Sequence, residues 1–235
     1  MSSRDKILAR IKRALSVKTI RPESHEGLVL NSSYADQMVD HEPRTHWMRD
    51  PGTTLEVNLA LFKQLSEQLH SEIHEVATLT DAGTLLSRLA EKNGWCRLGI
   101  HRGALCDKVR TLVGCEWLET DGGYDASDLE TCQAGISECE ALIAQTGSVL
   151  VTSRSSGGRA LSVLPPHHVV LVGKEQLLPD LSSAYTLLAN KYKDDYPSLI
   201  SFITGPSRTG DIERTLVLGA HGPKRLTIIL IDHPS

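Results

Sequence analysis

The sequence predicts an α/β fold in which a layered, mostly parallel sheet is flanked by helices. Segments with the 3.6-residue apolar period of a helix alternate with short apolar runs typical of strands. Several of these runs, such as 169–172, are apolar on both faces, as expected for parallel strands that are covered by helices on each side. The 235 residues are enough for one large domain of this kind.

An N-terminal helical arm is expected over residues 1–53, before the α/β domain at 54–235. Residues 3–15 repeat apolar side chains at helical spacing, with five Lys and Arg residues on the other face. This pattern favours a peripheral helix packed on its own domain or on a sister subunit, because any surface helix shows such a stripe. The alternatives are a transit peptide and a helix that docks on an acidic partner or a membrane surface. Residues 16–53 lack periodicity, which favours a binding segment or a linker.

Helices and strands alternate from residue 54 onward. Apolar residues at helical spacing predict a helix over 55–69, and a second helix over 81–92 is expected to stop at Asn93-Gly94. Two more helices are predicted at 138–145 and 175–193. The predicted strands are the apolar runs 73–79, 96–100, 112–118, 132–136, 148–152, 169–172, 199–204 and 226–231.

Composition and motifs exclude several classes of protein. The net charge of −4 leaves no domain-wide basic footprint for nucleic acid, and no apolar run is long enough to span a membrane. The N-terminus lacks the features of a signal peptide, so a cytoplasmic protein is expected. Neither a G-x-G-x-x-G dinucleotide fingerprint nor a P-loop is present, so NAD and ATP are not indicated.

The cysteines and histidines give no metal or cluster spacing. The five cysteines are separated by at least seven residues, which fits neither a disulfide framework nor a C-x-x-C site. Cys106 and Cys115 are expected to be buried thiols. His70 and His74 have i,i+4 spacing but lack the glutamate of a metalloprotease helix. We therefore expect no metal and no cofactor on this chain.

The stretch ITGPSRTGDIE at 203–213 is the first candidate site, because it leaves the predicted strand 199–204 at its carboxyl end. Free backbone N–H groups, two hydroxyls and an arginine would form a cradle for a small carboxylate or phosphate. The alternative is a capped helix start near Asp211, with the arginine paired to Asp211 or Glu213. The candidate ligand-binding residues are Gly205, Ser207, Arg208, Thr209 and Asp211.

Three further stretches offer groups for the same site. His221, beside Gly222 in a flexible turn, is a candidate general base, or a histidine that only fastens the loop. Thr146, Gly147 and Ser148 lie between a predicted helix and strand, where their N–H groups would face a ligand or form a C-cap. Arg159, after two glycines, is a second anion clamp or a solvated hairpin arginine.

Four segments together resemble the lactate utilisation protein C family, the LUD domain: AQTGS, GRALSVLPPHHVV, ITGPSRTGDIE and LVLGAHGPKRLTIILID. The resemblance covers roughly 54–232 and implies a NagB/RpiA/CoA-transferase-like fold. It also implies a cytoplasmic bacterial protein that is needed to oxidise L-lactate to pyruvate. Such a protein acts with two sister proteins that carry the iron–sulfur clusters, and the lack of cysteine motifs here fits that division.

One position departs from the family pattern. The family commonly reads Ala-Glu-Thr-Gly where this chain has Gln145 before Thr146. CoA-transferase relatives use a glutamate in an analogous setting as nucleophile, and an amide cannot do so. This argues against a glutamyl-CoA mechanism at Gln145.

Two functions follow from the sequence. In the first, the chain is a non-redox subunit of a lactate-oxidising complex and holds a small carboxylate or organises its partners. In the second, it is a free-standing sugar-phosphate isomerase or acyl/CoA-transferase-like enzyme. Fold alone does not choose between them. The first is favoured, and homo-oligomer formation stays open.

Overall fold

The computed structural model describes residues 49–193, 195–209, 217–219 and 221–234. The predicted arm lies almost entirely outside these residues, so its boundary with the α/β domain stays a prediction. The side chains of Thr209, Val217 and Leu218 also lie outside the described set.

Six strands form a parallel sheet, which confirms the predicted fold class. Every neighbouring pair in this sheet runs parallel. In order across the sheet, the strands are β1 (Glu72–Thr78), β12 (Arg225–His233), β7 (His167–Gly173), β4 (Ala134–Ser137), β2 (Arg97–Ile100) and β3 (Glu116–Glu119).

A second sheet packs against the first and was not expected. β6 pairs antiparallel with both β5 and β9, and β5 pairs parallel with β8. The strands are β8 (Leu177–Leu178), β5 (Ala141–Ile143), β6 (Ser148–Thr152) and β9 (Ile200–Ile203). The predicted strand at 199–204 is therefore present as β9. It belongs to the second sheet, whereas the candidate site at 203–213 was placed on the expectation that this strand is part of the parallel sheet.

The predicted helix over 138–145 is wrong. Ala141, Leu142 and Ile143 form β5 instead, and all three are at most 1% exposed. A short run that is apolar on every side has the same pattern in a buried strand and in a buried helix, so periodicity cannot distinguish them. The turn that includes Thr146 and Gly147 consequently joins two strands of a hairpin rather than ending a helix.

Two predicted helices are found close to their predicted bounds, α3 and α4, whereas α5 and α6 were not predicted. The Thr78 hydroxyl and the Asp81 carboxylate form a capping box at the start of α4, and Gly94 ends it in the left-handed conformation. The predicted helix 175–193 begins later, after a 3-10 turn at Lys174–Gln176. The helices are α3 (Leu55–Gln68), α4 (Leu79–Asn93), α5 (Ala104–Arg110), α6 (Ala126–Glu130) and α7 (Leu181–Tyr192).

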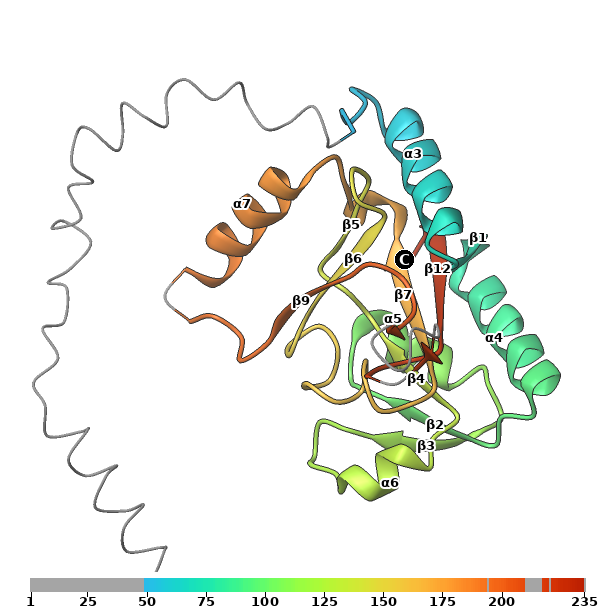
Figure 1. Cartoon of the computed structure of the whole chain (residues 1–235). Helices are drawn as coiled ribbons and strands as arrows, with labels where there is room; N and C mark the ends of the chain where they lie inside the picture. The colour runs from blue at the N-terminus through green and yellow to red at the C-terminus, as the bar shows by residue number, and fades with distance from the viewer. Residues whose placement is uncertain (1–48, 194, 210–216, 220, 235) are drawn as a thin grey trace, which may run out of the picture. The chain divides into compact units, whose positions relative to one another are not determined.

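The elements stack in layers around the parallel sheet (Figure 1). The side chains of β7 alternate between two apolar cores. Val169 and Leu171 face α4 and α5, whereas Val170 and Val172 face α3 and the second sheet. The far face of the second sheet is covered by α7, which packs on Ile143 and its neighbours. Burial on both faces accounts for the continuous apolar run of β7.

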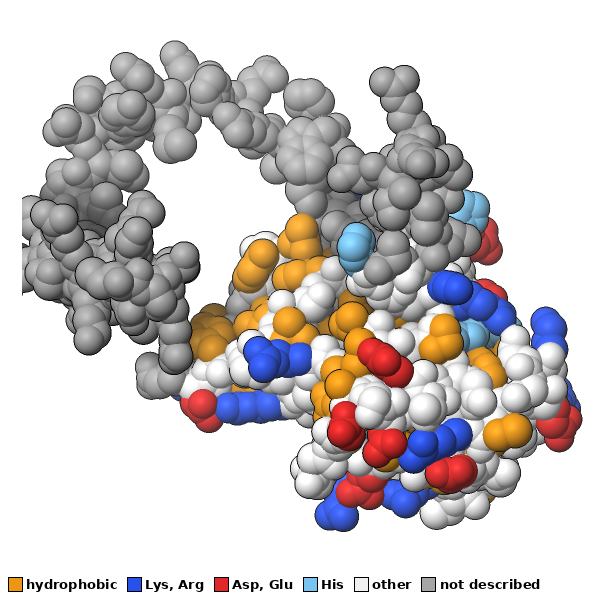
Figure 2. Space-filling model, turned by 60° about the horizontal axis from the view of Figure 1, so that its bottom comes forward, with side chains coloured by type: hydrophobic (Ala, Val, Ile, Leu, Met, Phe, Trp, Pro, Cys, Tyr) orange, Lys and Arg blue, Asp and Glu red, His pale blue; other side chains and the backbone are white. Residues whose placement is uncertain are grey.

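Lys and Arg side chains are interspersed with Asp and Glu on the face shown in Figure 2. No single-sign stripe dominates this face, so it does not resemble a nucleic-acid-binding surface. Within the described part of the chain, none of the helices has the length and apolar character needed to cross a bilayer.

Two buried histidines at the start of β7 make stability depend on pH. Burial lowers the pKa of His167 from 6.5 to about 4 and that of His168 to about 3. Both rings stay neutral in the folded chain but take up a proton below pH 6.5 once it unfolds. Their contribution is therefore complete above pH 6.5 and is lost as the pH falls toward the folded-state pKa values.

We predict that the free energy of unfolding falls between about pH 6.5 and pH 5, by up to ~1.4 kcal/mol per pH unit for each histidine. Urea unfolding across this range measures the slope. His168→Asn should reduce the slope, whereas His233→Asn, at an exposed position, should leave it unchanged. Equal slopes in the two variants would contradict the assignment.

Candidate functional site

The parallel sheet changes its direction of winding between β2 and β4. After β2 the chain continues through α5 to the outer strand β3, and after β4 it continues through the second sheet to β7, on the opposite side. Ligands of open parallel sheets bind in the crevice at such a switch point, outside the carboxyl ends of the strands. Here the first residues beyond those ends are His101 and Glu138.

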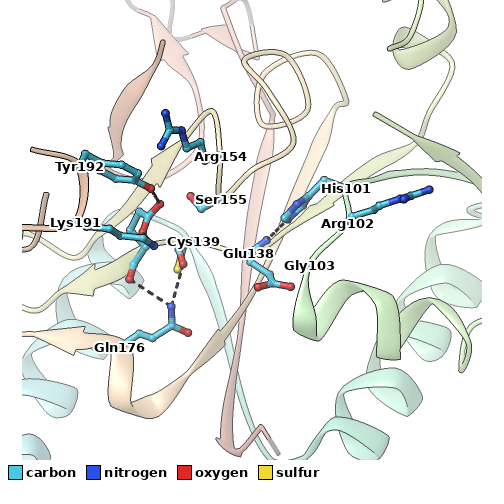
Figure 3. Close-up of a pocket in the computed structure, with 11 residues that line it drawn as sticks. His101, Arg102, Gly103, Glu138, Cys139, Arg154, Ser155, Gln176, Lys191 and Tyr192 are labelled. Atoms are coloured by element: carbon cyan, nitrogen blue, oxygen red, sulfur yellow. Dashed lines mark hydrogen bonds and ion pairs between the residues drawn. The ribbon is translucent and has the colours of Figure 1, made fainter. Parts of the chain in front are cut away.

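A cavity of about 490 Å³ lies at this switch point (Figure 3). Its walls come from the ends of β2 and β4, the turn after β6, and the end of α7. Polar and charged side chains dominate the lining. The residues are His101, Arg102, Gly103, Glu138, Cys139, Glu140, Arg154, Ser155, Gln176, Lys191 and Tyr192.

The Glu138 carboxylate is held by the first turn of α5. Its Oε1 accepts hydrogen bonds from the backbone N–H groups of Leu105, at 2.7 Å, and Cys106, at 3.1 Å. These two donors fix the orientation of the carboxylate. Gly103 makes the approach possible, because a Cβ at this position would lie 2.2 Å from Oε1. Glu138 is thus fixed in place at the end of β4.

His101 is buried beside this carboxylate. Its Nε2 accepts the backbone N–H of Glu138 at 3.0 Å, so Nδ1 carries the proton of the neutral ring. Nδ1 is buried and has no hydrogen-bond partner among the described residues. One possible ligand atom of each of His101, Cys106 and Glu138 lies within 4.8 Å of the others, a spacing that would suit a metal. Neither ring nitrogen offers a free lone pair, however, so this geometry does not favour a metal ligand.

Glu140 forms the opposite wall with two residues of α7. Its side chain is 2% exposed and accepts hydrogen bonds from Lys191 at 2.6 Å, Thr152 at 2.8 Å, and the Tyr192 hydroxyl. Burial raises the pKa of Glu140, but these three hydrogen bonds and the Lys191 charge outweigh burial, so the pKa is lowered overall. Glu140 is therefore ionised, and its partners tie α7 to β6.

A second cavity, of about 330 Å³, brings together five of the residues singled out in the sequence. They are Arg159, Gly205, Ser207, His221 and Gly222. The two turns that carry most of them are joined by backbone hydrogen bonds of 2.9 Å, from Ser207 to Pro223 and from Gly219 to Ser207. The N–H of Ser207 is therefore engaged by the chain itself and is not free for an anion, in contrast to the expectation from the sequence.

The other sequence candidates lie around this cavity. The Ser148 hydroxyl is 2.8 Å from that of Thr204, which lines the cavity. Thr146 has a buried hydroxyl without a partner among the described residues, and Gly147 packs against α3. Neither lines the cavity in the described structure.

Arg208 binds the chain itself. Its guanidinium donates to the carbonyl of Leu69, the C-cap residue of α3, and so anchors the turn. Gly205 allows the turn to lie close to the end of α3. It has a φ of 92°, and a Cβ there would lie 2.9 Å from the carbonyl oxygen of Leu69. Thr209 belongs to the short strand β10 (Arg208–Thr209), which pairs with β11 (Val217–Leu218). Asp211 lies outside the described residues.

A family model described as the LUD domain matches residues 59–231. The chain belongs to the LUD domain family. A relative named "Lactate utilization protein C" from Macrococcus caseolyticus is 28% identical over 212 residues, which cover 83% of this chain and 90% of the relative. A relative with the same name from Geobacillus sp. is 32% identical over 207 residues, covering 80% and 86%.

A solved structure has a similar fold. The chain is similar to a DUF162 family protein from Deinococcus radiodurans, with a TM-score of 0.57 and 19% identity, over 77% of this chain and 99% of that one. Gln145 has a structural role in this LUD domain: its amide nitrogen donates to the Arg49 carbonyl at 3.1 Å.

Sequence reasoning missed the residues of the switch-point cavity. Glu138 and Glu140 were assigned to a helix, so their position just beyond a parallel strand was not recognised. His101 was not considered, although it directly follows a predicted strand. These residues could have been found as polar residues that directly follow buried strands of a parallel sheet, because ligands bind at the carboxyl ends of such strands. Lys191 and Tyr192 gave no local signal, since they reach the cavity from α7.

We predict that Glu140→Gln lowers the free energy of unfolding by about 1–3 kcal/mol at neutral pH, because a buried charge-assisted network loses its acceptor charge. Since the pKa of Glu140 is lowered on folding, its contribution is complete above pH 4.5 and is lost as the pH falls through the folded-state pKa. The difference from wild type should therefore shrink in acid. Denaturant unfolding measures both effects.

Glu75→Gln is the matched control for Glu140→Gln. It removes an ion pair with Lys63 in which the carboxylate side chain is 42% exposed. A change below about 1 kcal/mol is expected for such a surface pair. An equal effect of the two substitutions would mean that the Glu140 network contributes no more than a surface ion pair.

Proposed function

We propose that this chain is a non-redox subunit of a bacterial system that oxidises L-lactate to pyruvate, acting in the cytoplasm with two iron–sulfur proteins. The supporting observation is its similarity to relatives named "Lactate utilization protein C" over most of both chains. The five cysteines are all free and lack cluster spacing. In this proposal the redox chemistry belongs to the partners, and this chain binds no cofactor of its own.

The cavity around Arg159 is the proposed site for a small carboxylate. Arg159 is exposed at its edge, and Ser201, Thr204 and Ser207 contribute hydroxyl donors. Among the described residues, no carboxylate lines this cavity and none forms an ion pair with Arg159. A guanidinium with nearby hydroxyls suits a carboxylate, which accepts two parallel hydrogen bonds from the planar fork.

His221 gives the proposed site a group able to exchange protons. It is exposed and lines the same cavity, beside Gly222. An imidazole can donate to a carboxylate or keto oxygen in one protonation state and accept a proton in the other. We assign it a supporting role in holding the ligand.

Growth on lactate tests the pathway. Deletion of the gene should abolish growth with L-lactate as sole carbon source but leave growth on pyruvate unchanged, and the intact gene supplied in trans should restore it. Normal growth of the deletion strain on lactate would refute the proposal. Turnover of a sugar phosphate or a CoA ester by the isolated chain would favour the free-standing enzyme instead.

Arg159→Ala tests the carboxylate site in the purified protein. Pyruvate should raise the melting temperature of the wild type through preferential binding to the folded state, and Arg159→Ala should remove this rise. Because Arg159 is exposed, the unliganded variant should stay within about 0.5 kcal/mol of wild type.

Two further variants complete the Arg159 experiment. Arg159→Lys should restore the rise only in part, since an ammonium lacks the planar fork. Arg88→Ala, at an exposed position on α4, is the matched control and should respond to pyruvate like wild type. An equal pyruvate response in Arg159→Ala and Arg88→Ala would place the carboxylate elsewhere.

A further inference from the structure

We propose that the crevice between β2 and β4 is a second ligand site, which takes a small hydroxylated anion and uses Glu138 to accept a hydrogen bond from the ligand's hydroxyl group. The crevice lies at the switch point of the sheet and holds about 490 Å³, a size typical of small-molecule sites. It shares no lining residue with the cavity around Arg159.

The two oxygens of Glu138 differ in their environment. Oε1 accepts two backbone N–H groups of α5, whereas Oε2 makes no hydrogen bond within the described structure. No described cation forms an ion pair with Glu138 either. An ionised carboxylate only accepts hydrogen bonds, so a ligand that complements Oε2 must bring a donor. A fixed carboxylate with one free oxygen is thus suited to bind a hydroxyl group.

His101 supplies an independent sign of a ligand. It lines the cavity and is 2% exposed, and its protonated Nδ1 has no partner among the described residues. A buried donor left without a partner is unfavourable, because the desolvation of its N–H is not compensated. Its Nε2 meanwhile holds the backbone of Glu138. His101 therefore positions Glu138 and keeps a buried, unsatisfied donor in the lining of the cavity.

Arg154 favours an anionic ligand over an amine at this cavity. Arg154 is stacked over the Tyr192 ring, with 5.2 Å from its guanidinium carbon to the ring centroid. Its ion-pair partner Asp195 has a side chain that is 85% exposed, so this pair is weak and a ligand anion can replace it. Lys191 lies beside it with 53% of its side chain exposed, but its ammonium is paired with Glu140 at 2.6 Å, so Arg154 is the main group for a ligand anion. A carboxylate or a phosphate fits these groups equally well.

Titration calorimetry on the full chain tests the proposal with three probes. Glycerate carries a carboxylate and hydroxyls, glycerol 3-phosphate carries a phosphate and hydroxyls, and propionate carries a carboxylate alone. At least one hydroxylated probe should bind about ten-fold more tightly than propionate, because a hydrogen bond to a charged acceptor contributes on that scale. The better of the two hydroxylated probes identifies the anionic group.

Glu138→Gln should remove most of this hydroxyl preference while the amide oxygen still accepts the N–H groups of α5. Glu91→Gln, at an exposed position on α4, is the matched control and should keep the preference. Arg154→Met should weaken both hydroxylated probes without changing Glu138, and it tests the site independently if Glu138→Gln fails to fold.

Three results would overturn the proposal. The first is the absence of any hydroxyl preference in the wild type, and the second is equal binding by Glu138→Gln and Glu91→Gln. The third is loss of the preference in Arg159→Ala, which would place the ligand in the other cavity. A failed pyruvate response at Arg159 leaves these readouts unaffected, so the two proposals fail separately.

Discussion

The contact between the Glu138 carboxylate and the first turn of α5 fixes the region where the sheet changes its winding. β2 and β4 are neighbours, but the segments that follow them move apart, so no regular pairing joins their ends. Glu138 bridges this gap by accepting the N–H groups of Leu105 and Cys106. His101 completes the bridge from the end of β2. The crevice is thus held open with a defined shape, and Gly103 leaves room for this bridge, because a Cβ there would lie 2.2 Å from Glu138 Oε1.

The other wall of the crevice depends on a charge that is buried and fully partnered. Glu140 leads into β5, and its donors Lys191 and Tyr192 are the last residues of α7. An ionised carboxylate with 2% exposure is tolerated only because three donors surround it. Gln176 adds to this wall by donating to the carbonyl of Cys139 at 2.9 Å. The position of α7 over the second sheet and the shape of the crevice are consequently set by the same hydrogen bonds.

Local signals were enough to predict much of the fold but little of the crevice. Gly94 directly follows the last turn of α4, so the end of this helix could be predicted, whereas its start at the Thr78 capping box was placed two residues too late. The run at 141–143 has no amphipathic period, because it lies between two layers, and it was mistaken for part of a helix. Glu140 and Lys191 are 51 residues apart, and only the tertiary structure brings them together. The turns at Ser207 and His221 could be linked beforehand because each is rich in glycine, proline and polar side chains.

The two cavities differ in the hydrogen-bonding groups that they offer to a ligand, and they lie at the ends of different strands. Arg159 and the hydroxyls gather where β9 ends and just before β12 begins, whereas Glu138 lies beyond the carboxyl ends of β2 and β4. The first cavity offers hydrogen-bond donors, as a carboxylate requires. The second offers a fixed acceptor and the guanidinium of Arg154, as a hydroxylated anion requires. Since the lining residues do not overlap, one chain can hold two such ligands at once, and a substitution in either cavity should leave binding in the other unchanged.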